Sequence, residues 1–245
     1  MKNWHTEKFV INDTNLNNKN IVPITEIIRF LQIATFNHSK LISLDHKTMQ
    51  EQSNAFWVVT KMKLKLSSSI CQGDKISATT WTHPVGGVRA LRDCHIKCGN
   101  SIKVKATSEW CCLDWDTRKL RKMNSISYPN LLMEKTNNLN LMFSNLREDV
   151  SQEDFVYTRK VRSTDIDVNN HTNNLKYNFM AFDCLAVEEL NKINIKEYEI
   201  HFVNESCEGD EISMFKKHIR NAYYIEGKIQ DKTIFKVVIK FQKIN

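Results

Sequence analysis

Hydrophobic and polar positions repeat with two different periods along the chain, and the two periods follow one another in the same order twice. Each half starts with a short alternating stretch, continues with an apolar stripe at helical spacing, and ends with four further alternating stretches. A period near that of the α-helix indicates a helix, whereas strict alternation indicates a half-buried strand. The pattern predicts two copies of one α+β unit, each a helix followed by an antiparallel meander.

The first copy begins with a short strand at residues 8 to 13 and a strongly apolar helix that starts at Ile24, behind Pro23. Turn residues such as Gly86-Gly87 separate the alternating stretches that follow. Those predicted strands are FWVVTKMKLKLSS, GDKISATTWTH, VRALRDCHIK and SIKVKATSEWCCLD.

The second copy has a strand from Phe155, a helix over residues 173 to 190, and the strands YEIHFVNES, DEISMFKKHI, AYYIEGKIQ and TIFKVVIKFQK. One local match supports duplication, because ICQGDKIS around Gly73 returns as SCEGDEIS around Gly209. Residues between the copies lack strand alternation and are predicted to form a linker. The expected domains are therefore 1–127 and 153–245, with the linker at 128–152.

The entry to the second predicted helix collects residue types that carry chemistry. Asp165, Asp167, Asn169 and His171 precede it in one polar run. The unpaired N–H groups of a first helical turn stabilise a developing oxyanion in front of them, and imidazole, amide and carboxylate groups can orient a water and move a proton. Asp and Asn also gather in turns, where they bond their own backbone, so the density of polar residues alone does not separate the two interpretations.

The run D-x-D-x-N-x-H-x-N-N-x-x-Y, from Asp165 to Tyr177, resembles the signature of the acyl-acyl-carrier-protein thioesterases. That family carries Asp, Asn and His at this spacing before the central helix of its second hot-dog domain, and the matching residues here are Asp167, Asn169 and His171. The resemblance extends over most of the chain. It implies an α+β fold of two tandem hot-dog domains, each a long central helix wrapped by an antiparallel β-sheet, packed as a pseudo-dimer.

Alignment of the two copies indicates which of them carries the chemistry. If Asp13 is set against Asp165, Lys19 stands where His171 does, so that only the second copy has the histidine. We therefore expect the first copy to be non-catalytic and to bind the acyl chain with its apolar helix. Most side chains of that helix must also form the core, and sequence does not separate the two uses.

The expected acid is Glu205, which precedes the second Gly-Asp turn at the place where the resembling family has its catalytic acid. Alignment of the two Gly-Asp turns puts Ser69 opposite Glu205, so the acid is also confined to the second copy. The family often has Cys directly after this Glu, whereas here Ser206 follows and Cys207 comes one residue later. A different, ungapped match places Cys207 on the family's cysteine, and its thiol is the alternative nucleophile.

The resemblance implies hydrolysis of a fatty acyl-acyl-carrier-protein thioester, which releases free fatty acid and terminates fatty acid synthesis. Glu205 is expected to act as general base on water, or to attack directly, while His171 shares the proton handling or orients the water. Asn169 and helix N-terminal amides are expected to stabilise the oxyanion, and Asp167 to fix the hydrogen-bonded set. Asp165 is expected to be structural. No metal or redox cofactor is implied.

Three alternatives remain from the sequence. The first is the same reaction on acyl-coenzyme A. The second is a hot-dog hydratase acting on enoyl thioesters, which the motif disfavours because it differs from the dehydratase type. The third is a non-catalytic acyl-thioester binder or sensor, against which stands the presence of His171 and Glu205 together in one copy.

The net charge limits the classes of binding partner that we expect. Lys and Arg number 35 against 28 Asp and Glu, a formal net charge of +7 spread along the chain. A diffuse positive field suits an acidic partner such as acyl carrier protein. It also suits nucleic acid, but the sequence has no recognisable nucleic-acid-binding motif, so none is expected. Two hot-dog units in one chain are compatible with a monomer or a homodimer.

Cysteine content and the N-terminal sequence indicate the cellular compartment in which we expect the protein. Seven cysteines without a signal peptide indicate reduced thiols and a cytoplasmic location, or a plastid one after removal of a transit peptide. The segment MKNWHTEKFV has no apolar run of membrane length, so no membrane partner is expected. Cys94-His95-Ile-Lys-Cys98 lacks a second ligand pair at zinc spacing, and its alternation fits a strand better than a metal site.

Overall fold

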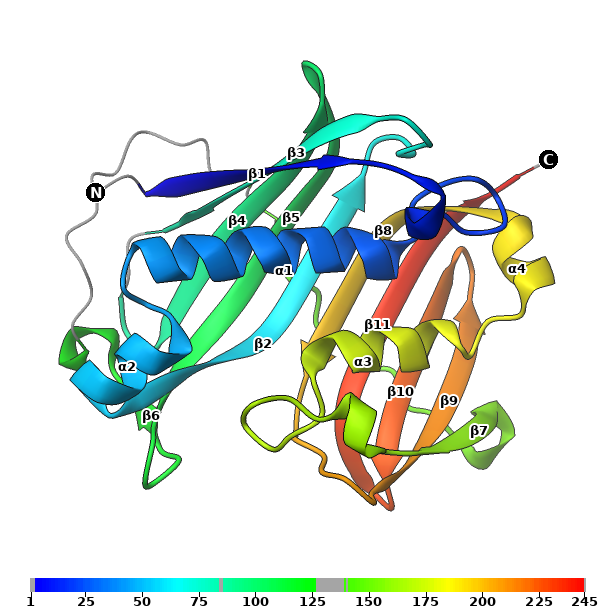
Figure 1. Cartoon of the computed structure of the whole chain (residues 1–245). Coiled ribbons are helices and arrows are strands. Elements are labelled where there is room, and N and C mark those ends of the chain that lie inside the picture. The colour runs from blue at the N-terminus through cyan, green and yellow to red at the C-terminus, as the bar shows by residue number, and fades with distance from the viewer. Residues whose placement is uncertain (1–2, 84–85, 127–138, 140, 245) are drawn as a thin grey trace. The chain divides into compact units, whose positions relative to one another are not determined.

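The computed structural model describes residues 3–83, 86–126, 139 and 141–244 of the 245-residue chain. The chain divides into two compact units, unit 1 (Met1–Met142) and unit 2 (Phe143–Asn245), each with helices and an antiparallel sheet (Figure 1). The division falls inside the expected linker, of which residues 128–138 and 140 lie outside the described residues. The described remainder of that segment has no regular strand or α-helix.

Unit 1 consists of a long helix and a meander, as predicted. Its helices are α1 (Ile24–Leu41) and α2 (His46–Ser53), with 3₁₀ turns η1 (Asp13–Asn15) and η2 (Met123–Ser125). Its strands are β1 (Trp4–Val10), β2 (Ala55–Leu66), β3 (Lys75–Thr82), β4 (Arg89–Cys98), β5 (Ser101–Asp114) and β6 (Leu120–Arg121). They pair antiparallel in the order β1-β3-β4-β5-β2, with β6 on β5.

Helix α1 forms where the sequence predicts it, because apolar residues recur along one helical face. Pro23 supplies the extended N-cap backbone, which fixes the start of the helix. Acidic Glu26 in the first turn and basic Lys40 in the last turn both complement the helix dipole. The side chains that α1 buries are Ile24, Thr25, Ile27, Ile28, Phe30, Leu31, Ala34 and His38.

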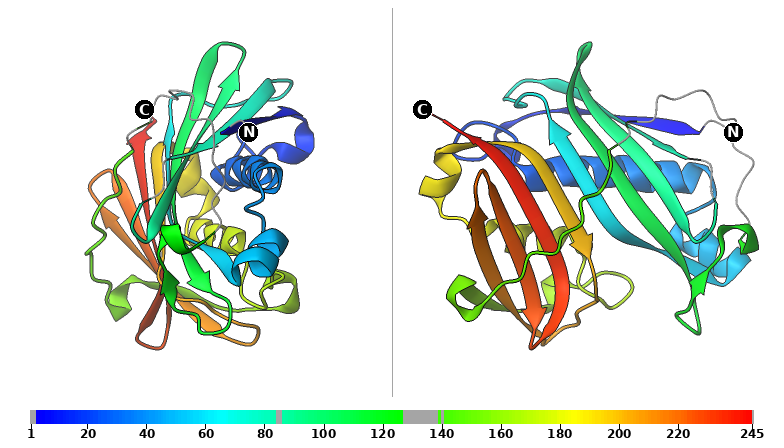
Figure 2. Two further views of the ribbon diagram at one scale, coloured as in Figure 1. Left: turned by 90° about the vertical axis from the view of Figure 1, so that its left-hand side faces the viewer. Right: turned by 180° about the vertical axis from the view of Figure 1, so that it is seen from behind.

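Unit 2 repeats the same order of elements. It contains η3 (Gln152–Asp154), β7 (Phe155–Lys160), η4 (Ser163–Asp165), α3 (Asn174–Phe182), α4 (Val187–Asn191), β8 (Ile193–Phe202), β9 (Glu211–Ile219), β10 (Ala222–Ile229) and β11 (Lys232–Lys243). The strands pair antiparallel in the order β7-β9-β10-β11-β8, which is the unit 1 order with each strand replaced by its counterpart. Within unit 2, α3 lies on one face of this sheet (Figure 2).

The single helix predicted over residues 173 to 190 is wrong, because two helices occupy that range. Asp183 caps the C-terminus of α3, and Ala186 begins α4 with extended backbone whose N–H donates to Glu189 Oε2 at 2.9 Å. Leu185 and Leu190 continue the apolar spacing across the break. Periodicity therefore merges two helices that local capping separates.

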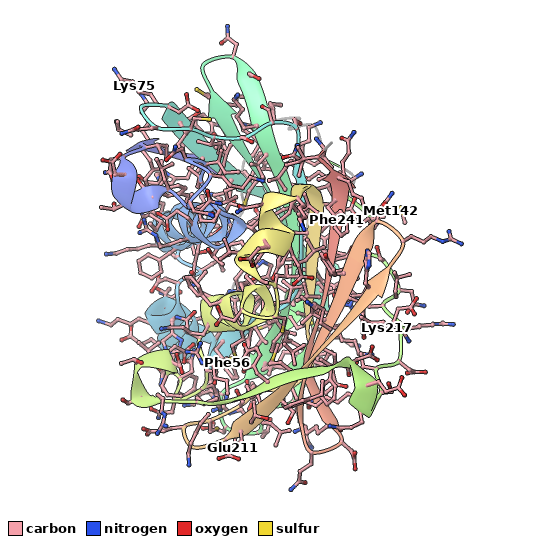
Figure 3. The ribbon with its side chains drawn as sticks, turned by 90° about the vertical axis from the view of Figure 1, so that its right-hand side faces the viewer. Phe56, Lys75, Met142, Glu211, Lys217 and Phe241 are labelled. Carbon is pink, nitrogen blue, oxygen red and sulfur yellow. The ribbon has the colours of Figure 1, made fainter. Side chains whose placement is uncertain are left out.

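The matched Gly-Asp turns have the same backbone geometry in both units. Gly73 and Gly209 have φ values of 78° and 92°, in the left-handed region that glycine adopts without a Cβ penalty. Each turn ends where a strand begins, and Figure 3 labels the first residues of those strands, Lys75 of β3 and Glu211 of β9. This agreement supports the duplication inferred from the sequence match.

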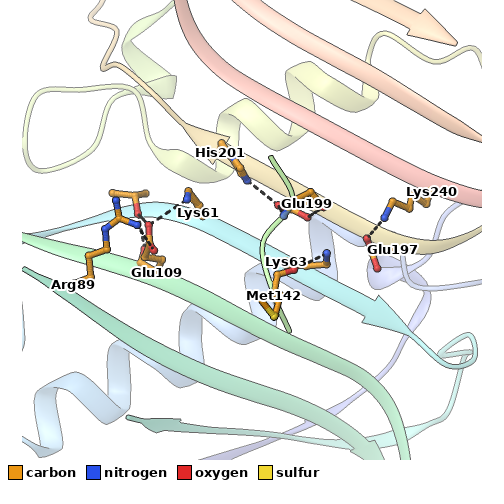
Figure 4. Close-up of polar contacts among 11 residues, drawn as sticks. Lys61, Lys63, Arg89, Glu109, Met142, Glu197, Glu199, His201 and Lys240 are labelled. Atoms are coloured by element: carbon orange, nitrogen blue, oxygen red, sulfur yellow. Dashed lines mark hydrogen bonds and ion pairs between the residues drawn. The ribbon is translucent and has the colours of Figure 1, made fainter. Parts of the chain in front are cut away.

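Polar side chains on β2 and β8 hold the described part of the expected linker (Figure 4). In unit 1, Lys63 Nζ donates to the carbonyl of Met142 at 2.9 Å. In unit 2, buried Glu199 accepts the N–H and the hydroxyl of Ser144 at 2.7 and 2.9 Å, and its Oε1 lies 2.8 Å from His201 Nε2. Each part of the segment is thus fixed to the sheet of its own unit.

Buried Asp165 anchors the loop that leads into α3. Its carboxylate accepts the N–H of Arg162 at 3.0 Å and lies 2.9 Å from Arg159 Nη2 and 3.5 Å from Lys176 Nζ. Burial by itself raises the pKa of Asp165, but these donors outweigh it, so that the pKa lies below its usual value. The contacts agree with the structural role expected for Asp165.

The equivalent anchor in unit 1 has its acid on the helix and a neutral side chain on the loop. There Asn15 occupies the loop position, and its N–H₂ group donates to Glu26 Oε1 at 2.7 Å on the helix. Arg29, one turn further along α1, donates to the other oxygen of Glu26 at 2.7 Å. Unit 1 therefore has a neutral loop side chain and an acidic helix, whereas unit 2 has an acidic loop and a basic helix residue, Lys176.

Replacement of Asp165 by Asn should lower the free energy of unfolding by about 2 kcal/mol at neutral pH, since charged hydrogen bonds to a buried carboxylate are lost. A lowered folded-state pKa contributes stability above the unfolded-state pKa of about 3.9, and this contribution is lost as pH falls through the folded-state pKa. Urea unfolding at several pH values should therefore show the wild-type advantage shrinking below about pH 4. Asp231→Asn, on an exposed turn, is the control. A pH-independent difference would contradict the assignment.

Gly227 permits close packing of β10 against β11, where it pairs with Phe235. A Cβ at position 227 would lie 2.5 Å from Phe235 Cε1, and Phe235 is fully buried. Gly227→Ala should lower the free energy of unfolding by about 1–3 kcal/mol through overpacking, measured by urea denaturation. Gly86→Ala is the matched control, because an added Cβ there meets no atom within 4 Å. Equal stabilities of the two variants would refute this prediction.

Candidate functional site

The loop before α3 positions three of the four predicted site residues. The carboxylate of Asp167 accepts the N–H of Asn169 at 2.8 Å, and its carbonyl accepts the N–H of Asn170 at 3.1 Å. Asn170 has φ 61°, a left-handed conformation that asparagine tolerates well. The N–H of Asp167 donates to the carbonyl of His171 at 2.9 Å, which closes the loop. These backbone bonds fix the direction in which Asn169 and His171 leave the chain.

His171 and Glu205 meet from two different segments. Strand β8 ends at Phe202, so Glu205 lies in the following turn and outside the strand predicted from YEIHFVNES. His171 Nε2 and Glu205 Oε2 are 3.2 Å apart, with side chains 22% and 50% exposed. A carboxylate at this distance can accept the imidazole N–H and exchange a proton with it. The exposed fractions leave both groups accessible to water.

The side chains of Asp167 and Asn169 do not form one hydrogen-bonded set with His171 and Glu205, although the sequence analysis expected this. Within the described residues, neither side chain bonds to His171 or Glu205. Asp167 uses its carboxylate on the loop backbone, so that its effect on His171 is transmitted through the loop. The Oδ1 atom of Asn169 is buried and has no hydrogen-bond partner among the described residues.

A buried amide atom without a partner costs about 1–3 kcal/mol, so Asn169 is suited to a partner that binds from outside the protein. The two ends of an amide side chain are assigned from their hydrogen bonds, and a turn of the amide presents N–H₂ in place of the oxygen. Asn169 can therefore accept from a bound group or donate to one.

Asn173 is the N-cap residue of α3. Its Oδ1 accepts the N–H of Leu175 at 2.9 Å, and its own N–H donates to the carbonyl of Asp165 at 2.8 Å. The cap thus ties the start of α3 to the buried anchor of the loop. This arrangement places His171 two residues before the helix cap.

Backbone bonds correct the alignment of the two copies at the histidine. In unit 1 the N–H of Asn17 donates to the carbonyl of Ile21 at 3.0 Å, as the N–H of Asp167 does to His171 at 2.9 Å. His171 therefore corresponds to Ile21 and not to Lys19. Matching the aspartates by residue type caused the two-residue error, whereas the loop hydrogen bonds set the true correspondence. The absence of histidine at this place in unit 1 is unchanged.

The alignment at the acid is confirmed. The N–H of Val22 donates to the carbonyl of Ile70 at 2.9 Å in unit 1, and the N–H of Thr172 donates to the carbonyl of Ser206 at 2.8 Å in unit 2. Ile70 therefore corresponds to Ser206, and the residue before it, Ser69, corresponds to Glu205. Unit 1 has neither the imidazole nor the carboxylate of the unit 2 pair.

Cys207, the alternative nucleophile, is an exposed residue of the Gly-Asp turn. Its N–H donates to Asp210 Oδ2 at 2.8 Å, and Cys71 of unit 1 donates in the same way to Asp74 Oδ2 at 3.0 Å. The same cysteine in the same turn of the unit without the His-Glu pair supports a structural role for Cys207.

Three residues with hydroxyl groups also belong to the site. The sequence analysis did not identify them as a group. Thr172 directly follows His171, Ser206 directly follows Glu205, and Tyr177 closes the motif. Ser206 Oγ lies 2.7 Å from Thr172 Oγ1 and 2.9 Å from Tyr177 Oη. The adjacency of Thr172 and Ser206 to predicted catalytic residues, and the place of Tyr177 in the motif, were the signals available in the sequence.

The Cys94-His95-Ile-Lys-Cys98 segment is part of β4, as its alternation predicts. Cys94 Sγ contacts Thr80 Oγ1, whereas the His95 ring packs 5.4 Å from the ring of Trp81, so the two adjacent side chains leave opposite faces of the sheet. Burial, with Lys97 and Lys105 nearby, lowers the pKa of His95 to about 4. Among the described residues, no three His, Cys, Asp or Glu side chains are grouped to hold a metal ion.

A helix needs about 20 predominantly apolar residues to cross a bilayer. None of the helices in the described part of the chain is both long enough and apolar enough to span a membrane.

Curated relatives of the chain are plant enzymes. It is 23% identical over 225 residues to oleoyl-acyl carrier protein thioesterase 1, chloroplastic, of Arabidopsis thaliana, a match covering 85% of this chain and 62% of that protein. It is 25% identical over 204 residues to the palmitoyl-acyl carrier protein thioesterase, chloroplastic, of the same plant, covering 77% of this chain and 48% of that protein. The chain thus spans between about half and about three-fifths of the length of these relatives.

Solved structures match over the full length. An acyl-ACP thioesterase from Bacteroides thetaiotaomicron superposes with a TM-score of 0.87 at 21% identity, covering 98% of both chains. The 12:0-ACP thioesterase from Umbellularia californica superposes with a TM-score of 0.83 at 15% identity, covering 100% of this chain and 99% of that one. At these identities the likeness concerns the fold, and it confirms the predicted α+β tandem hot-dog architecture.

Family models match both halves of the chain. Residues 2–127 match the acyl-ACP thioesterase N-terminal domain, and residues 148–243 match the acyl-ACP thioesterase C-terminal domain. These two matches cover most of the sequence, with the N-terminal domain model on the first half and the C-terminal domain model on the second, and they agree with the division of the chain into two units. The chain therefore belongs to the acyl-ACP thioesterase family.

Proposed function

We propose that this protein hydrolyses the thioester of a fatty acyl group carried by acyl carrier protein, releasing free fatty acid and so terminating fatty acid synthesis. The observation that carries the proposal is the approach of His171 Nε2 to Glu205 Oε2 at 3.2 Å in a half-exposed site. Family membership supports the reaction class. The equivalent positions in unit 1, Ile21 and Ser69, cannot do this chemistry, so hydrolysis is assigned to unit 2.

In the proposed reaction Glu205 removes a proton from a water molecule, whose oxygen forms a bond to the thioester carbon. The carbonyl oxygen becomes an oxyanion, which the amide of Asn169 stabilises by donating a hydrogen bond. Collapse of this intermediate breaks the carbon–sulfur bond. The leaving thiolate receives a proton through His171, which exchanges protons with Glu205 across their contact. Asp167 contributes by holding the loop that carries Asn169 and His171.

The unpartnered amide atom of Asn169 supports its role as the oxyanion donor. A group that is buried and unsatisfied in the free protein gains a hydrogen bond only when a ligand arrives. The recurrence of cysteine in the unit 1 turn supports water over Cys207 as the nucleophile.

The proposed partner is acyl carrier protein, an acidic protein. The net charge of +7 and the carrier-protein substrates in the names of the plant relatives support this choice. We also propose a cytoplasmic location, or a plastid one after removal of a transit peptide, because all seven cysteines are free thiols. The plant relatives named above are chloroplastic.

Glu205→Gln and His171→Ala should each lower kcat by at least about a hundredfold, since each removes a proton-transfer group without emptying a core site. Thiol release from acyl-acyl carrier protein measures this, with circular dichroism to check folding. Glu208→Gln, exposed in the same turn, and Ser69→Ala, the unit 1 counterpart of Glu205, are matched controls that should retain activity. A Glu205→Gln variant as active as these controls would overturn the assignment of the base.

Carrier protein and coenzyme A are distinguished by comparing the two thioesters at the same acyl length. We expect a higher kcat/KM with acyl-acyl carrier protein, and we expect added salt to lower that value more than the value for acyl-coenzyme A, because screening weakens attraction between the basic enzyme and an acidic protein. Equal kcat/KM values with equal salt dependence would show that the carrier protein is not recognised. A series of acyl lengths in the same assay gives the chain-length preference.

A further inference from the structure

Three buried hydroxyl groups form a closed hydrogen-bonded cluster next to the His171–Glu205 pair. They belong to Thr172, Tyr177 and Ser206, and each of these residues is at most 4% exposed. Ser206 Oγ is central, at 2.7 Å from Thr172 Oγ1 and 2.9 Å from Tyr177 Oη. The cluster therefore joins the residue after the histidine to the residue after the acid.

The positions of the hydroxyl protons follow from the backbone partners. The N–H of Ser206 donates to Tyr177 Oη at 3.2 Å, and the hydroxyl of Thr172 donates to the carbonyl of Ser206 at 3.1 Å, because a carbonyl can only accept. Thr172 Oγ1 must then accept from the Ser206 hydroxyl, and Ser206 Oγ must accept from the Tyr177 hydroxyl. Each hydroxyl donates once and accepts once. One chain of bonds runs from the N–H of Ser206 back to its own carbonyl.

This chain of bonds fixes the two peptide groups that carry the site. The N–H of Ser206 belongs to the peptide that links it to Glu205. The N–H of Thr172, which donates to the carbonyl of Ser206 at 2.8 Å, belongs to the peptide that links it to His171. Burial raises the pKa of the Tyr177 phenol, so that it stays protonated and keeps donating at neutral pH. The hydroxyl cluster thus holds the peptide groups from which the side chains of His171 and Glu205 extend.

Unit 1 shows that the fold does not need these hydroxyls. The residues at the equivalent positions are Val22, Ile27 and Ile70, all at most 5% exposed. Ile27 and Tyr177 are each the fourth residue of their helix, and the backbone bond from Val22 to Ile70, at 2.9 Å, matches the bond from Thr172 to Ser206. Buried apolar side chains therefore stand at these positions, with the same backbone bond. Buried hydroxyls lose hydration that apolar side chains do not have, so their use in unit 2 alone points to a need other than folding.

We propose that Thr172, Tyr177 and Ser206 are positioning residues, a hydroxyl clamp that holds His171 and Glu205 at reacting distance. The inference rests on the proposed hydrolysis and assigns the clamp no direct contact with substrate. Ser206, although it directly follows the acid, is not the nucleophile, because its hydroxyl proton is donated to Thr172 Oγ1 and its side chain is buried.

Tyr177→Phe and Ser206→Ala test the clamp through steady-state kinetics. Each should lower kcat by about tenfold to a hundredfold with little change in KM, because a small displacement of the reacting groups raises the barrier without removing substrate contacts. Ser206→Cys keeps a donor and an acceptor at the same place and should retain more activity than Ser206→Ala. This recovery separates hydrogen bonding from simple loss of volume.

Tyr198→Phe is the matched control for stability. Tyr198 is a fully buried tyrosine of unit 2 whose hydroxyl donates to Asn178 Oδ1 at 2.5 Å, a bond that includes neither the clamp residues nor the His-Glu pair. Removal of the Tyr198 hydroxyl should lower the melting temperature about as much as we expect for Tyr177→Phe, but it should leave kcat unchanged. If Tyr177→Phe and Ser206→Ala also keep wild-type kcat, the hydroxyls serve only the fold and the proposal is wrong.

Crystal structures of the wild type and Tyr177→Phe provide a readout independent of activity. The clamp predicts that the His171 Nε2 to Glu205 Oε2 distance, 3.2 Å here, lengthens or becomes variable in Tyr177→Phe and is retained in Tyr198→Phe. If the wild type cleaves no thioester, the proposed function fails, and these distances still decide the clamp. An unchanged distance in Tyr177→Phe would refute it.

Discussion

One backbone hydrogen bond, made once in each unit, ties the loop before the helix to the turn that leads into the meander. In unit 2 it joins Thr172 to Ser206, and in unit 1 it joins Val22 to Ile70, across long stretches of chain. Peptide groups that are buried must be paired, so this bond sets where the loop and the turn can lie whatever side chains they carry. The proposed catalytic pair depends on this bond, since His171 and Glu205 are the residues directly before the two bonded positions.

This backbone bond fixes the loop and the turn, which together we call the backbone frame. Because the frame is fixed, the side chains around it can differ between the two units. Unit 1 fills the frame with Val22, Ile27 and Ile70, which need no partners. Unit 2 fills it with hydroxyls that satisfy one another, and places an imidazole and a carboxylate on the accessible side. Comparison of equivalent positions in the two units thus distinguishes side chains that the fold requires from those that the proposed reaction requires.

Much of this architecture follows from the sequence, because periodicity records which face of each element is buried. The long strands and α1 could be predicted on that basis, although β1 begins at Trp4 and not at residue 8, and the two-residue strand β6 was not predicted. The break between α3 and α4 could not be predicted, since Leu185 and Leu190 keep helical spacing across it. The site residues were found through a family resemblance. Their contacts depend on loop bonds that residue types do not reveal, which explains both the two-residue error at Ile21 and the unexpected use of the Asp167 carboxylate on its own loop.

The different charges at the two helix entries bear on how a duplicated chain folds correctly. Two similar units in one polypeptide can trade equivalent segments while folding, and repeat proteins are prone to such misassembly. The loop of unit 2 brings the buried carboxylate of Asp165 to a helix with Lys176, whereas the helix of unit 1 presents Glu26 at that place. A traded pairing would set Asp165 against Glu26, two carboxylates in a poorly hydrated position, which is unfavourable. The anchor thus disfavours pairing of the unit 2 loop with the unit 1 helix.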